Sequence, residues 1–306
     1  MSADRPTVLC AGTVSLDTVE SGARAAYDVL GGSAPYFAAA ARLESRVSIV
    51  GAVGEDFPED QIKRLQAAGI GVSALARAPG ETFRWHVRYQ RDGSRQTVKT
   101  NRARALATTL EVPPELAEPQ ALFLGSTDPS VQASALRGAG TPELVVLDTM
   151  SHWIHDRRED FEMLTRSADV VLLNEEEAKI LGDGDYEKGV RPILEGGCSW
   201  VVVKRGDQGA IAFGHDRAIA ASAPRVPGLV DPTGAGDAFA GGLVSTLARE
   251  WPATLGMEAA LKNACAMGSF AIESFSIDRL LEITAEGAVG RGREVSTKMR
   301  LHRSAP

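Results

Sequence analysis

The amino-acid sequence predicts an α/β fold, in which helices cover both faces of a doubly wound, mostly parallel sheet. Short apolar segments alternate with stretches of helical character. This alternation is the pattern of βαβ units, whose strands are buried on both sides. A period-two pattern over 82–100 adds a small accessory sheet. No internal repeat or low-complexity linker interrupts the 306 residues, so we expect a single domain over 1–306. The apolar segments lie at 121–125, 144–148, 169–174 and 200–204.

The composition is that of an ordinary globular protein. Apolar residues make up 44% of the chain and charged residues 24%. The net charge of −7 argues against a nucleic-acid partner. No window approaches the length of a membrane span, so we expect no membrane partner. Cys10, Cys198 and Cys265 are odd in number and far apart, which favours reduced, buried thiols and a cytoplasmic location.

The first strand, expected over 7–12, is followed by Asp17. An acid just past the carboxyl end of a strand lies where open α/β sheets bind ligands, although Asp17 could also cap a turn. Gly31 and Gly32 then precede an alanine-rich helix. Ser33 is expected to be the N-cap of that helix.

Residues 46–100 are expected to form a strand, a helix and a hairpin. The strand covers 46–53, and the helix covers 59–68 and stops at Gly69. The hairpin turns at Asp92-Gly93. The first hairpin strand has an apolar and a basic face, and the basic face could meet solvent or an anionic ligand. Its apolar positions are Phe83, Trp85, Val87 and Tyr89, and its basic positions are Arg84, His86 and Arg88.

Polar residues end several of the later strands. Asp148, Asn174 and Lys204 would line one rim of the sheet, where the active site of such folds is expected. Asn174 can also cap the next helix, with Glu177 as its capping-box acid. Lys204 begins a turn between two strands.

The most informative stretch is 231–242, with the sequence Asp-Pro-Thr-Gly-Ala-Gly-Asp-Ala-Phe-Ala-Gly-Gly. We interpret it as a tight turn leading into a helix, where the amides of Gly234, Ala235 and Gly236 converge on an anion. Asp237 would lie in the first helical turn. A carboxylate beside an anion site is understandable if the anion is a phosphoryl group in transit and the carboxylate takes the proton of the attacking hydroxyl. The alternative is a glycine-rich helix start with an acid that complements the helix dipole.

The rest of the chain is expected to be mostly helical. An apolar helix follows the glycine loop, and a second helix rich in small residues covers 256–275 and includes Asn263. The polar tail after Arg291 is expected to be a surface helix or a frayed end.

The 231–242 stretch resembles the C-terminal signature of the ribokinase/PfkB family of carbohydrate and nucleoside kinases. It lacks the Lys-Ser/Thr pair of a Walker loop. The resemblance implies a ribokinase-like fold, with lid strands from about 13–30 and 82–101 inserted over the substrate cleft. It runs from Gly12 to about Ile283 and includes the Gly12–Asp17 spacing, the Gly31–Gly32 pair and the Asn174–Glu177 element.

The resemblance also implies roles for individual residues. Asp237 would be the general base, and the loop amides would stabilise the transferred group. Mg²⁺ would be held by Asn174 and Glu177 through water. Tyr36 stands near the place where many members carry an Asn that bonds a sugar hydroxyl, and it cannot copy an amide. The implied substrate contacts are Asp17, Gly31, Gly32, Ser33, Tyr36, Arg84 and Asp237, the implied ATP contacts are Asn174, Lys204, Gly206, Thr233, Gly234, Gly236 and Asn263, and a monovalent cation such as K⁺ would lie near Asp231 and Thr233.

These expectations favour an ATP-dependent kinase that transfers the γ-phosphoryl group to a hydroxyl of a sugar or sugar-like molecule. A nucleoside is the alternative acceptor, with Tyr36, Phe83 and Trp85 as possible stacking surfaces. A second alternative is a catalytically weak, ligand-binding regulator. The apolar lid face could cover the substrate or pair with the lid of another subunit to form a homodimer.

Overall fold

The apolar segments form the centre of a large sheet in the computed structural model, which describes residues 5–90, 94–101, 103–252 and 256–301. Neighbouring strands are parallel from the β5 edge as far as β11 and antiparallel from β11 to the β14 edge. Within the described residues the ten strands pair in the order β14 (Thr297–Leu301), β13 (Arg217–Ala221), β12 (Ala210–Phe213), β11 (Trp200–Lys204), β10 (Val170–Asn174), β9 (Leu144–Leu147), β8 (Ala121–Leu124), β1 (Thr7–Ala11), β4 (Arg46–Gly54) and β5 (Gly71–Ala78).

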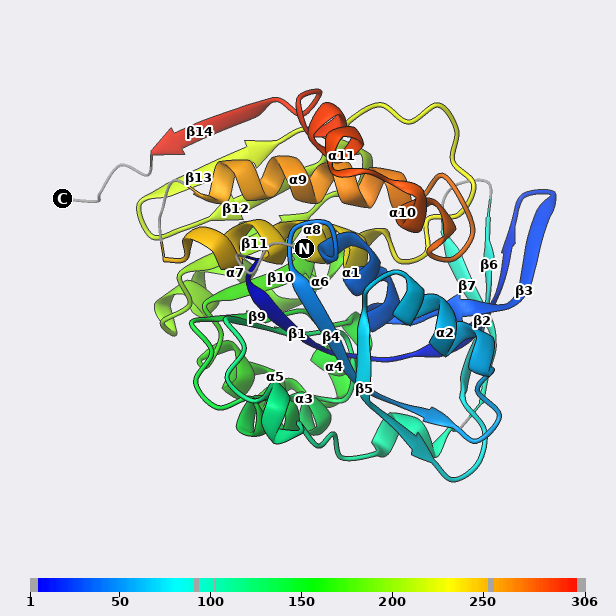
Figure 1. Ribbon diagram of the computed structural model, residues 1–306. Helices are drawn as coiled ribbons and strands as arrows, with labels where there is room; N and C mark the ends of the chain where they lie inside the picture. Colours follow the sequence, from blue (N-terminus) through cyan, green and yellow to red (C-terminus); the bar gives the residue numbers. More distant parts are fainter. Residues whose placement is uncertain (1–4, 91–93, 102, 253–255, 302–306) are drawn as a thin grey trace.

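The central strands are buried on both faces because their side chains alternate. In β8, Phe123 joins one apolar cluster and Leu124 joins the other. Figure 1 shows α8 and α9 on one side of the sheet and α3 and α5 on the other. Short 3₁₀ segments lie at Arg104–Ala107, Pro114–Leu116 and Gly206–Gln208. The helices with buried residues in the first cluster are α1 (Ser33–Ala41), α2 (Glu59–Ala67), α8 (Ala235–Glu250), α9 (Gly256–Ala271), α10 (Asp278–Glu282) and α11 (Ala285–Gly292), and those of the second are α3 (Pro129–Gly138), α4 (Ser151–Asp156), α5 (Arg158–Thr165), α6 (Glu175–Leu181) and α7 (Tyr186–Glu195).

Small residues let α8 approach its two neighbours closely. A Cβ on Gly241 would lie 2.3 Å from the carbonyl oxygen of Phe37 in α1. A Cβ on Gly242 would lie 2.9 Å from the carbonyl oxygen of Asn263 in α9. Larger residues at these positions would push α8 outward, so the two glycines fix where the helix and its N-terminal loop lie.

A second, four-stranded sheet stands beside the large one, at the right of Figure 1. We call it the lid sheet. It fits the predicted small sheet, while the predicted turn at Asp92-Gly93 lies outside the described residues. Its strands pair in the order β3 (Arg24–Gly31), β2 (Ser15–Ser21), β6 (Phe83–Tyr89) and β7 (Arg95–Thr100).

Two sequence predictions are corrected by the structure. Ser33 is not the N-cap of α1, because Gly32 occupies that position and Ser33 is already helical. The Ser33 hydroxyl instead accepts a hydrogen bond from the N–H of Thr13 at 3.1 Å. In the tail after Arg291, residues 297–301 form β14 and pair with β13 instead of forming a surface helix or a frayed end.

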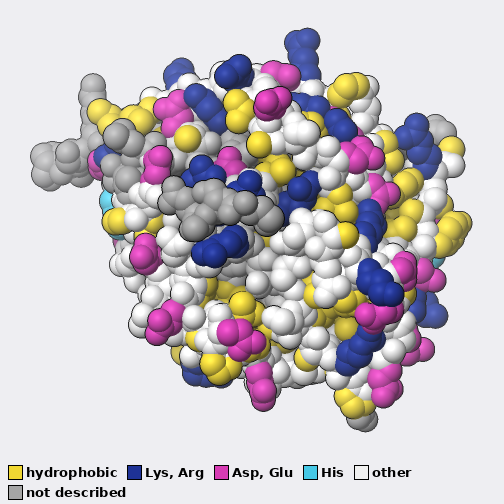
Figure 2. Space-filling view, viewed as in Figure 1, with side chains coloured by type: hydrophobic (Ala, Val, Ile, Leu, Met, Phe, Trp, Pro, Cys, Tyr) yellow, Lys and Arg dark blue, Asp and Glu magenta, His cyan; other side chains and the backbone are white. Residues whose placement is uncertain are grey.

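Other expectations are confirmed or adjusted. The α/β fold with a mostly parallel sheet and a small separate sheet is confirmed. The helix expected over 256–275 ends at Ala271. The three cysteines are free and buried. None of the helices in the described residues is long and apolar enough to cross a membrane. Acidic and basic side chains are interspersed on the face shown in Figure 2.

Candidate active site

The glycine loop, residues 231–236, and the start of α8 have the geometry of an anion-binding site. Gly234 precedes the helix in the left-handed conformation, with φ at 73°. Among the described residues, the N–H groups of Gly234 and Gly236 have no hydrogen-bond partner. The Ala235 nitrogen is 3.4 Å from the Pro232 carbonyl oxygen. Free amides at the N-terminus of a 16-residue helix make a suitable anion site.

Asp237 lies in the first turn of α8, beside these amides. Its side chain remains partly open to solvent. Surrounding protein, together with the carboxylate of Asp148, raises the pKa of Asp237 to about 7, while the cations Lys204 and Arg95 oppose the shift. A carboxyl group that exchanges its proton near neutral pH is suited to general-base catalysis.

Lys204 and Asp148 form an ion pair next to the loop. Lys204 ends β11 and Asp148 follows β9, so both lie at the carboxyl edge of the parallel strands. The Lys204 Nζ is 2.6 Å from Oδ2 of the buried Asp148. A Cβ on Gly236 would lie 3.4 Å from this Nζ. Burial lowers the pKa of Lys204, but Asp148 and Glu177 outweigh it and hold the pKa above its usual value, so Lys204 is charged at neutral pH.

Asn174 and Glu177 form the capping box that the sequence analysis predicts as the alternative to binding Mg²⁺. The Asn174 side chain accepts from the Glu177 N–H at 2.8 Å, and the Glu177 Oε2 accepts from the Asn174 N–H at 2.7 Å. Glu177 is buried, and this burial together with Asp148 raises its pKa to about 7 although Lys204 lowers it. The cap uses one carboxylate oxygen of Glu177 and leaves the other for a further contact.

Asp17 lies on β2 of the lid sheet, against the glycine pair at the start of α1. It is 3% exposed, and its Oδ1 has no hydrogen-bond partner. Burial raises its pKa to about 7, and the charges of Asp231 and Asp237 add to the shift. A Cβ on Gly31 would lie 2.0 Å from the Asp17 Oδ2, and one on Gly32 would lie 2.4 Å from the Thr13 carbonyl oxygen. Gly31 is therefore required for Asp17 to occupy its position, and Gly32 for the close approach of Thr13.

The position of Tyr36 does not suit the role of a stacking surface for a nucleoside, which the sequence analysis considers. Its side chain is 2% exposed, and a Cβ on Gly234 would lie 2.3 Å from its ring. The ring therefore supports the glycine loop from within the protein. A second tyrosine, Tyr89 of the lid sheet, approaches the loop from outside, with its hydroxyl 3.0 Å from Thr233 Oγ1.

Asp231 begins the loop as a fully buried carboxylate. Its Oδ1 accepts from the Thr233 N–H at 2.9 Å, and its Oδ2 has no hydrogen-bond partner. Burial raises its pKa. A buried carboxylate oxygen without a hydrogen-bond partner can serve as a ligand for a cation. Asp231 therefore fits the monovalent cation site that the resemblance implies.

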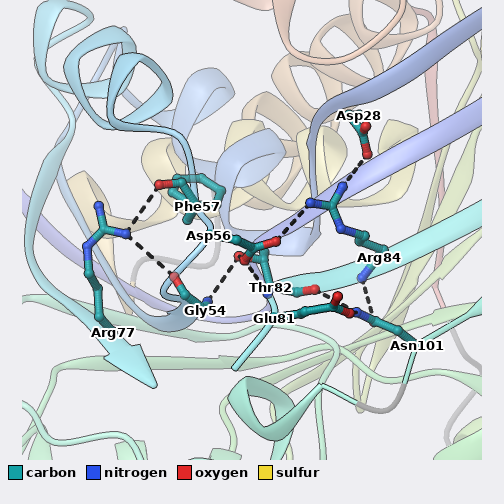
Figure 3. Close-up of polar contacts among 9 residues, drawn as sticks. All are labelled: Asp28, Gly54, Asp56, Phe57, Arg77, Glu81, Thr82, Arg84 and Asn101. Carbon is teal, nitrogen blue, oxygen red and sulfur yellow. Dashed lines mark hydrogen bonds and ion pairs between the residues drawn. The ribbon is translucent and has the colours of Figure 1, made fainter. Parts of the chain in front are cut away.

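Arg84 is held between two acids and fastens the lid sheet to the loop after β4 (Figure 3). Its guanidinium lies 2.8 Å from Asp56 and forms a second ion pair with Asp28 of β3. Asp56 in turn accepts from the N–H and the hydroxyl of Thr82, at 2.6 and 2.7 Å. Asn101 closes the network by accepting from the Arg84 N–H at 2.8 Å. The side chain of Arg84, which the resemblance implies as a substrate contact, is therefore already paired with acidic residues of the protein itself.

The other basic positions of β6 are also paired. His86 and Arg88 both contact Glu20 of β2, each at 2.7 Å. The opposite face of β6 holds the fully buried Val87 and the Tyr89 that reaches the glycine loop. The apolar face of β6 therefore contacts the loop through Tyr89.

Asn263 and Gly206 are less informative. The Asn263 amide donates to the Gly242 carbonyl oxygen and to Thr246 Oγ1, both at 3.0 Å, so it joins α9 to α8. Gly206 has a φ of +57° and open space around it. The sequence analysis places Asp148 at the rim of the sheet without giving it a role, and it does not single out Arg95, because no local pattern indicates that either charge acts on Asp237.

Comparisons with known proteins show the family to which the chain belongs. The model of the pfkB family of carbohydrate kinases matches residues 12–283. The chain belongs to the PfkB family. It is therefore a phosphotransferase that acts on a hydroxyl group. The match includes Asp17, the glycine pair and the loop with Asp237.

Two curated proteins are similar to this chain in sequence. The cytidine kinase of Thermococcus kodakarensis is 27% identical over 270 residues, which cover 85% of this chain and 97% of that protein. The aminoimidazole riboside kinase of Salmonella typhimurium is 30% identical over 161 residues, or 49% of this chain and 50% of that one.

Solved structures share the fold. The Methanocaldococcus jannaschii nucleoside kinase superposes with a TM-score of 0.80 at 19% identity, covering 95% of this chain and 99% of that one. A Vibrio cholerae fructokinase bound to fructose, ADP and calcium superposes with a TM-score of 0.76 at 22% identity, covering 94% and 99%.

Proposed function

We propose that the protein is an ATP-dependent nucleoside kinase that phosphorylates a ribose hydroxyl. The observation that carries the proposal is that two carboxyl groups suited to different tasks lie in one site. Asp17 has a buried oxygen without a partner, while Asp237 lies beside the free loop amides. The charge of Asp237 contributes to the raised pKa of Asp17, so the two groups are close enough to interact.

The relatives favour a riboside over a free sugar. One similar protein is a cytidine kinase and covers most of this chain, and another is an aminoimidazole riboside kinase. A sugar, which the sequence analysis placed first, becomes the second candidate, and the description of the family as carbohydrate kinases supports it. A catalytically weak regulator is disfavoured because the loop, its free amides and Asp237 are all present.

The residues supply three functions in the transfer. Asp17 accepts hydrogen bonds from acceptor hydroxyls and orients them. Asp237 takes the proton of the attacking hydroxyl as its oxygen bonds to the γ-phosphorus. The amides of Gly234 and Gly236 donate to the transferred phosphoryl oxygens, a contribution of about 3–4 kcal/mol for one strong donor of this kind. Lys204 holds a positive charge beside the loop, where the negative charge of the phosphates gathers.

A divalent ion such as Mg²⁺ fits the residues at this edge of the sheet. Glu177 retains one carboxylate oxygen beyond its capping role, and such hard oxygen donors, supplemented by water, are what Mg²⁺ prefers. When bound, the ion would neutralise phosphate charge and polarise the γ-phosphoryl group. Asp231 would hold the monovalent cation through its unpartnered oxygen. Free, buried cysteines fit the proposed cytoplasmic location.

An acceptor panel tests the proposal. ADP release would be followed with Mg²⁺-ATP and, in separate wells, cytidine, inosine, other nucleosides, ribose and fructose, with and without K⁺. We expect release that depends on a nucleoside and exceeds that with any free sugar. Turnover of a free sugar with none of the nucleosides would replace the nucleoside proposal with the sugar candidate.

A further inference from the structure

Arg95 lies on the face of the lid sheet that looks toward the glycine loop. It is directly opposite Tyr89 in the β6–β7 ladder, and residues opposite each other in an antiparallel pair point to the same face. Tyr89 extends from that face to Thr233. In the neighbouring β2–β6 pair, Asp17 is opposite Trp85, which shares the face of Tyr89. Arg95 and the acceptor-binding carboxylate of Asp17 are therefore on one surface.

A break in the ladder separates Arg95 from the other cation of β7. The register shifts between His86 and Val87, which places Lys99 opposite His86 and Arg95 opposite Tyr89. Lys99 consequently belongs to the face of the Glu20 ion pairs. The two cations of one strand thus point to opposite sides of the lid sheet.

Arg95 differs from the described basic residues of β6 in having no acidic partner. Arg84 is paired with Asp28 and Asp56, and the other two basic residues of that strand are paired with Glu20. Arg95 forms no ion pair with any described residue, and its guanidinium lies over the Trp85 ring, 5.9 Å from the centroid. Such stacking holds a guanidinium in place while leaving its N–H groups free to donate.

The charge of Arg95 reaches the reacting groups. It lowers the pKa of Asp237, of Glu177 and of the Tyr89 hydroxyl, in each case against the effect of burial. These three residues lie in different elements, α8, α6 and β6. Arg95, a cation without an ion-pair partner among the described residues, therefore stands on the face of the lid sheet from which Tyr89 contacts the glycine loop.

We propose that Arg95 binds the γ-phosphoryl group of ATP from the lid side, opposite the loop amides of Gly234 and Gly236. The inference rests on the proposed kinase function. In the transfer, the bond from the γ-phosphorus to the β,γ-bridging oxygen breaks and its electron pair leaves with ADP. The acceptor oxygen bonds to the same phosphorus, and its proton goes to Asp237. Arg95 donates to the phosphoryl oxygens throughout, and its planar fork suits two of them at once.

The test compares Arg95→Met and Arg95→Lys with the matched control Lys99→Met from the other face of the strand. The first readout is binding, which needs no acceptor. Calorimetry would measure the affinity for Mg²⁺-ADP and for the Mg²⁺ complex of the β,γ-imido analogue of ATP. Because a charge-assisted bond to phosphate is strong, Arg95→Met should weaken binding of the analogue about 10-fold or more and of ADP about 2-fold at most.

The second readout is turnover with the nucleoside that the wild-type enzyme phosphorylates best. Arg95→Met should lower kcat by about 10²-fold or more, as arginines that contact a transferred phosphoryl group do. Arg95→Lys should restore part of the loss, because it keeps the charge and loses the fork. Lys99→Met should match the wild type in both readouts.

Two results would overturn the proposal. One is an unchanged affinity of Arg95→Met for the imido analogue, which would leave Arg95 as a support for Trp85. The other is an equal loss of affinity for ADP and for the analogue, which would place the contact on another part of the nucleotide. A wild-type enzyme without activity on any nucleoside would instead remove the proposed acceptor, and the binding comparison would still decide the role of Arg95.

Discussion

At the scale of single residues, the site is defined by carboxyl groups whose pKa values lie far above the ordinary range. Asp237, Asp17 and Glu177 each have a pKa of about 7, and burial is the largest cause in all three. Lys204 limits the shift of Asp237 by its positive charge. The proposed general base is therefore tuned by the charge of a neighbouring residue.

This tuning predicts a pH dependence. Below pH 7 the Asp237 carboxyl is protonated and cannot accept the proton of the acceptor, so kcat/KM should rise with pH with an apparent pKa near 7. Lys204→Met removes a charge that lowers the pKa of Asp237, and the rise should therefore move to higher pH. The exposed Lys188 provides a control, since Lys188→Met should leave the profile unchanged. A Lys204→Met profile that coincides with the wild type would contradict the assignment.

A second prediction concerns the glycine pair. Gly31→Ala would place a Cβ 2.0 Å from the Asp17 Oδ2, which must move away. We expect the KM for the nucleoside to rise about 10-fold or more, as for the loss of a hydrogen bond to a charged group, with little change in the KM for ATP. Gly290→Ala is the control, because nothing lies within 4 Å of its Cβ and alanine suits a helix. Equal effects on both substrates would mean that Asp17 does not hold the acceptor.

Single residues were only partly predictable from the sequence. The position of Asp237 in the first turn of α8 and the Asn174–Glu177 cap follow from local rules of helix starts. The burial of Tyr36 behind Gly234 and the use of Asn263 between two helices depend on how distant segments pack. No local pattern carries that information.

At the scale of elements, the lid sheet is fastened to the large sheet by polar contacts around Asp56. That carboxylate accepts from Thr82 and from Arg84, at the point where the chain enters β6 (Figure 3). Although partial burial raises the pKa of Asp56, these partners outweigh it and lower the pKa overall. The stability from these bonds is therefore present above the unfolded-state pKa of 3.8 and is lost as the pH falls below it.

The contribution of the Asp56 contacts can be measured as a change in the free energy of unfolding. Asp56→Ala removes the acceptor of three hydrogen bonds and leaves the N–H and the hydroxyl of Thr82 without this partner, so the free energy of unfolding should fall by about 1–3 kcal/mol at pH 7. Glu162→Ala removes an exposed ion pair to Arg158 and should cost about 0.5 kcal/mol at most. Urea unfolding at pH 7 and at pH 3.5 would test this. The difference between wild type and Asp56→Ala should shrink at the lower pH, and an undiminished difference would contradict the account.

The parallel centre of the large sheet was predictable because its strands are continuous apolar runs with helical segments between them. The edge strands were not. β5 was missed although most of its residues are apolar, and β14, whose side chains are mostly exposed, was expected as a helix or a frayed end. Both strands are defined by pairing with a neighbour. The register shift in β7 that separates Arg95 from Lys99 is likewise a property of pairing.

At the scale of the whole molecule, the two apolar clusters keep the three cysteine thiols out of reach of solvent. Cys10, Cys198 and Cys265 are buried, and burial raises their pKa values, to about 12 for the last two. Since the thiolate is the reactive form, a disulfide reagent such as DTNB should modify none of the three rapidly in the native protein and all three in denaturant. Rapid modification of the native protein would show that the core opens more readily than its packing implies.

The central claim is that the fold brings a nucleoside hydroxyl, a phosphoryl group and Asp237 together. The most direct measurement is nucleoside-dependent ADP release by the wild type and by Asp237→Asn, with ATP affinity determined for both. We predict that the wild type is active, and that the variant loses about 10²-fold or more in kcat while its ATP affinity stays within several-fold. Near-normal turnover by Asp237→Asn would contradict the claim that this carboxylate takes the proton.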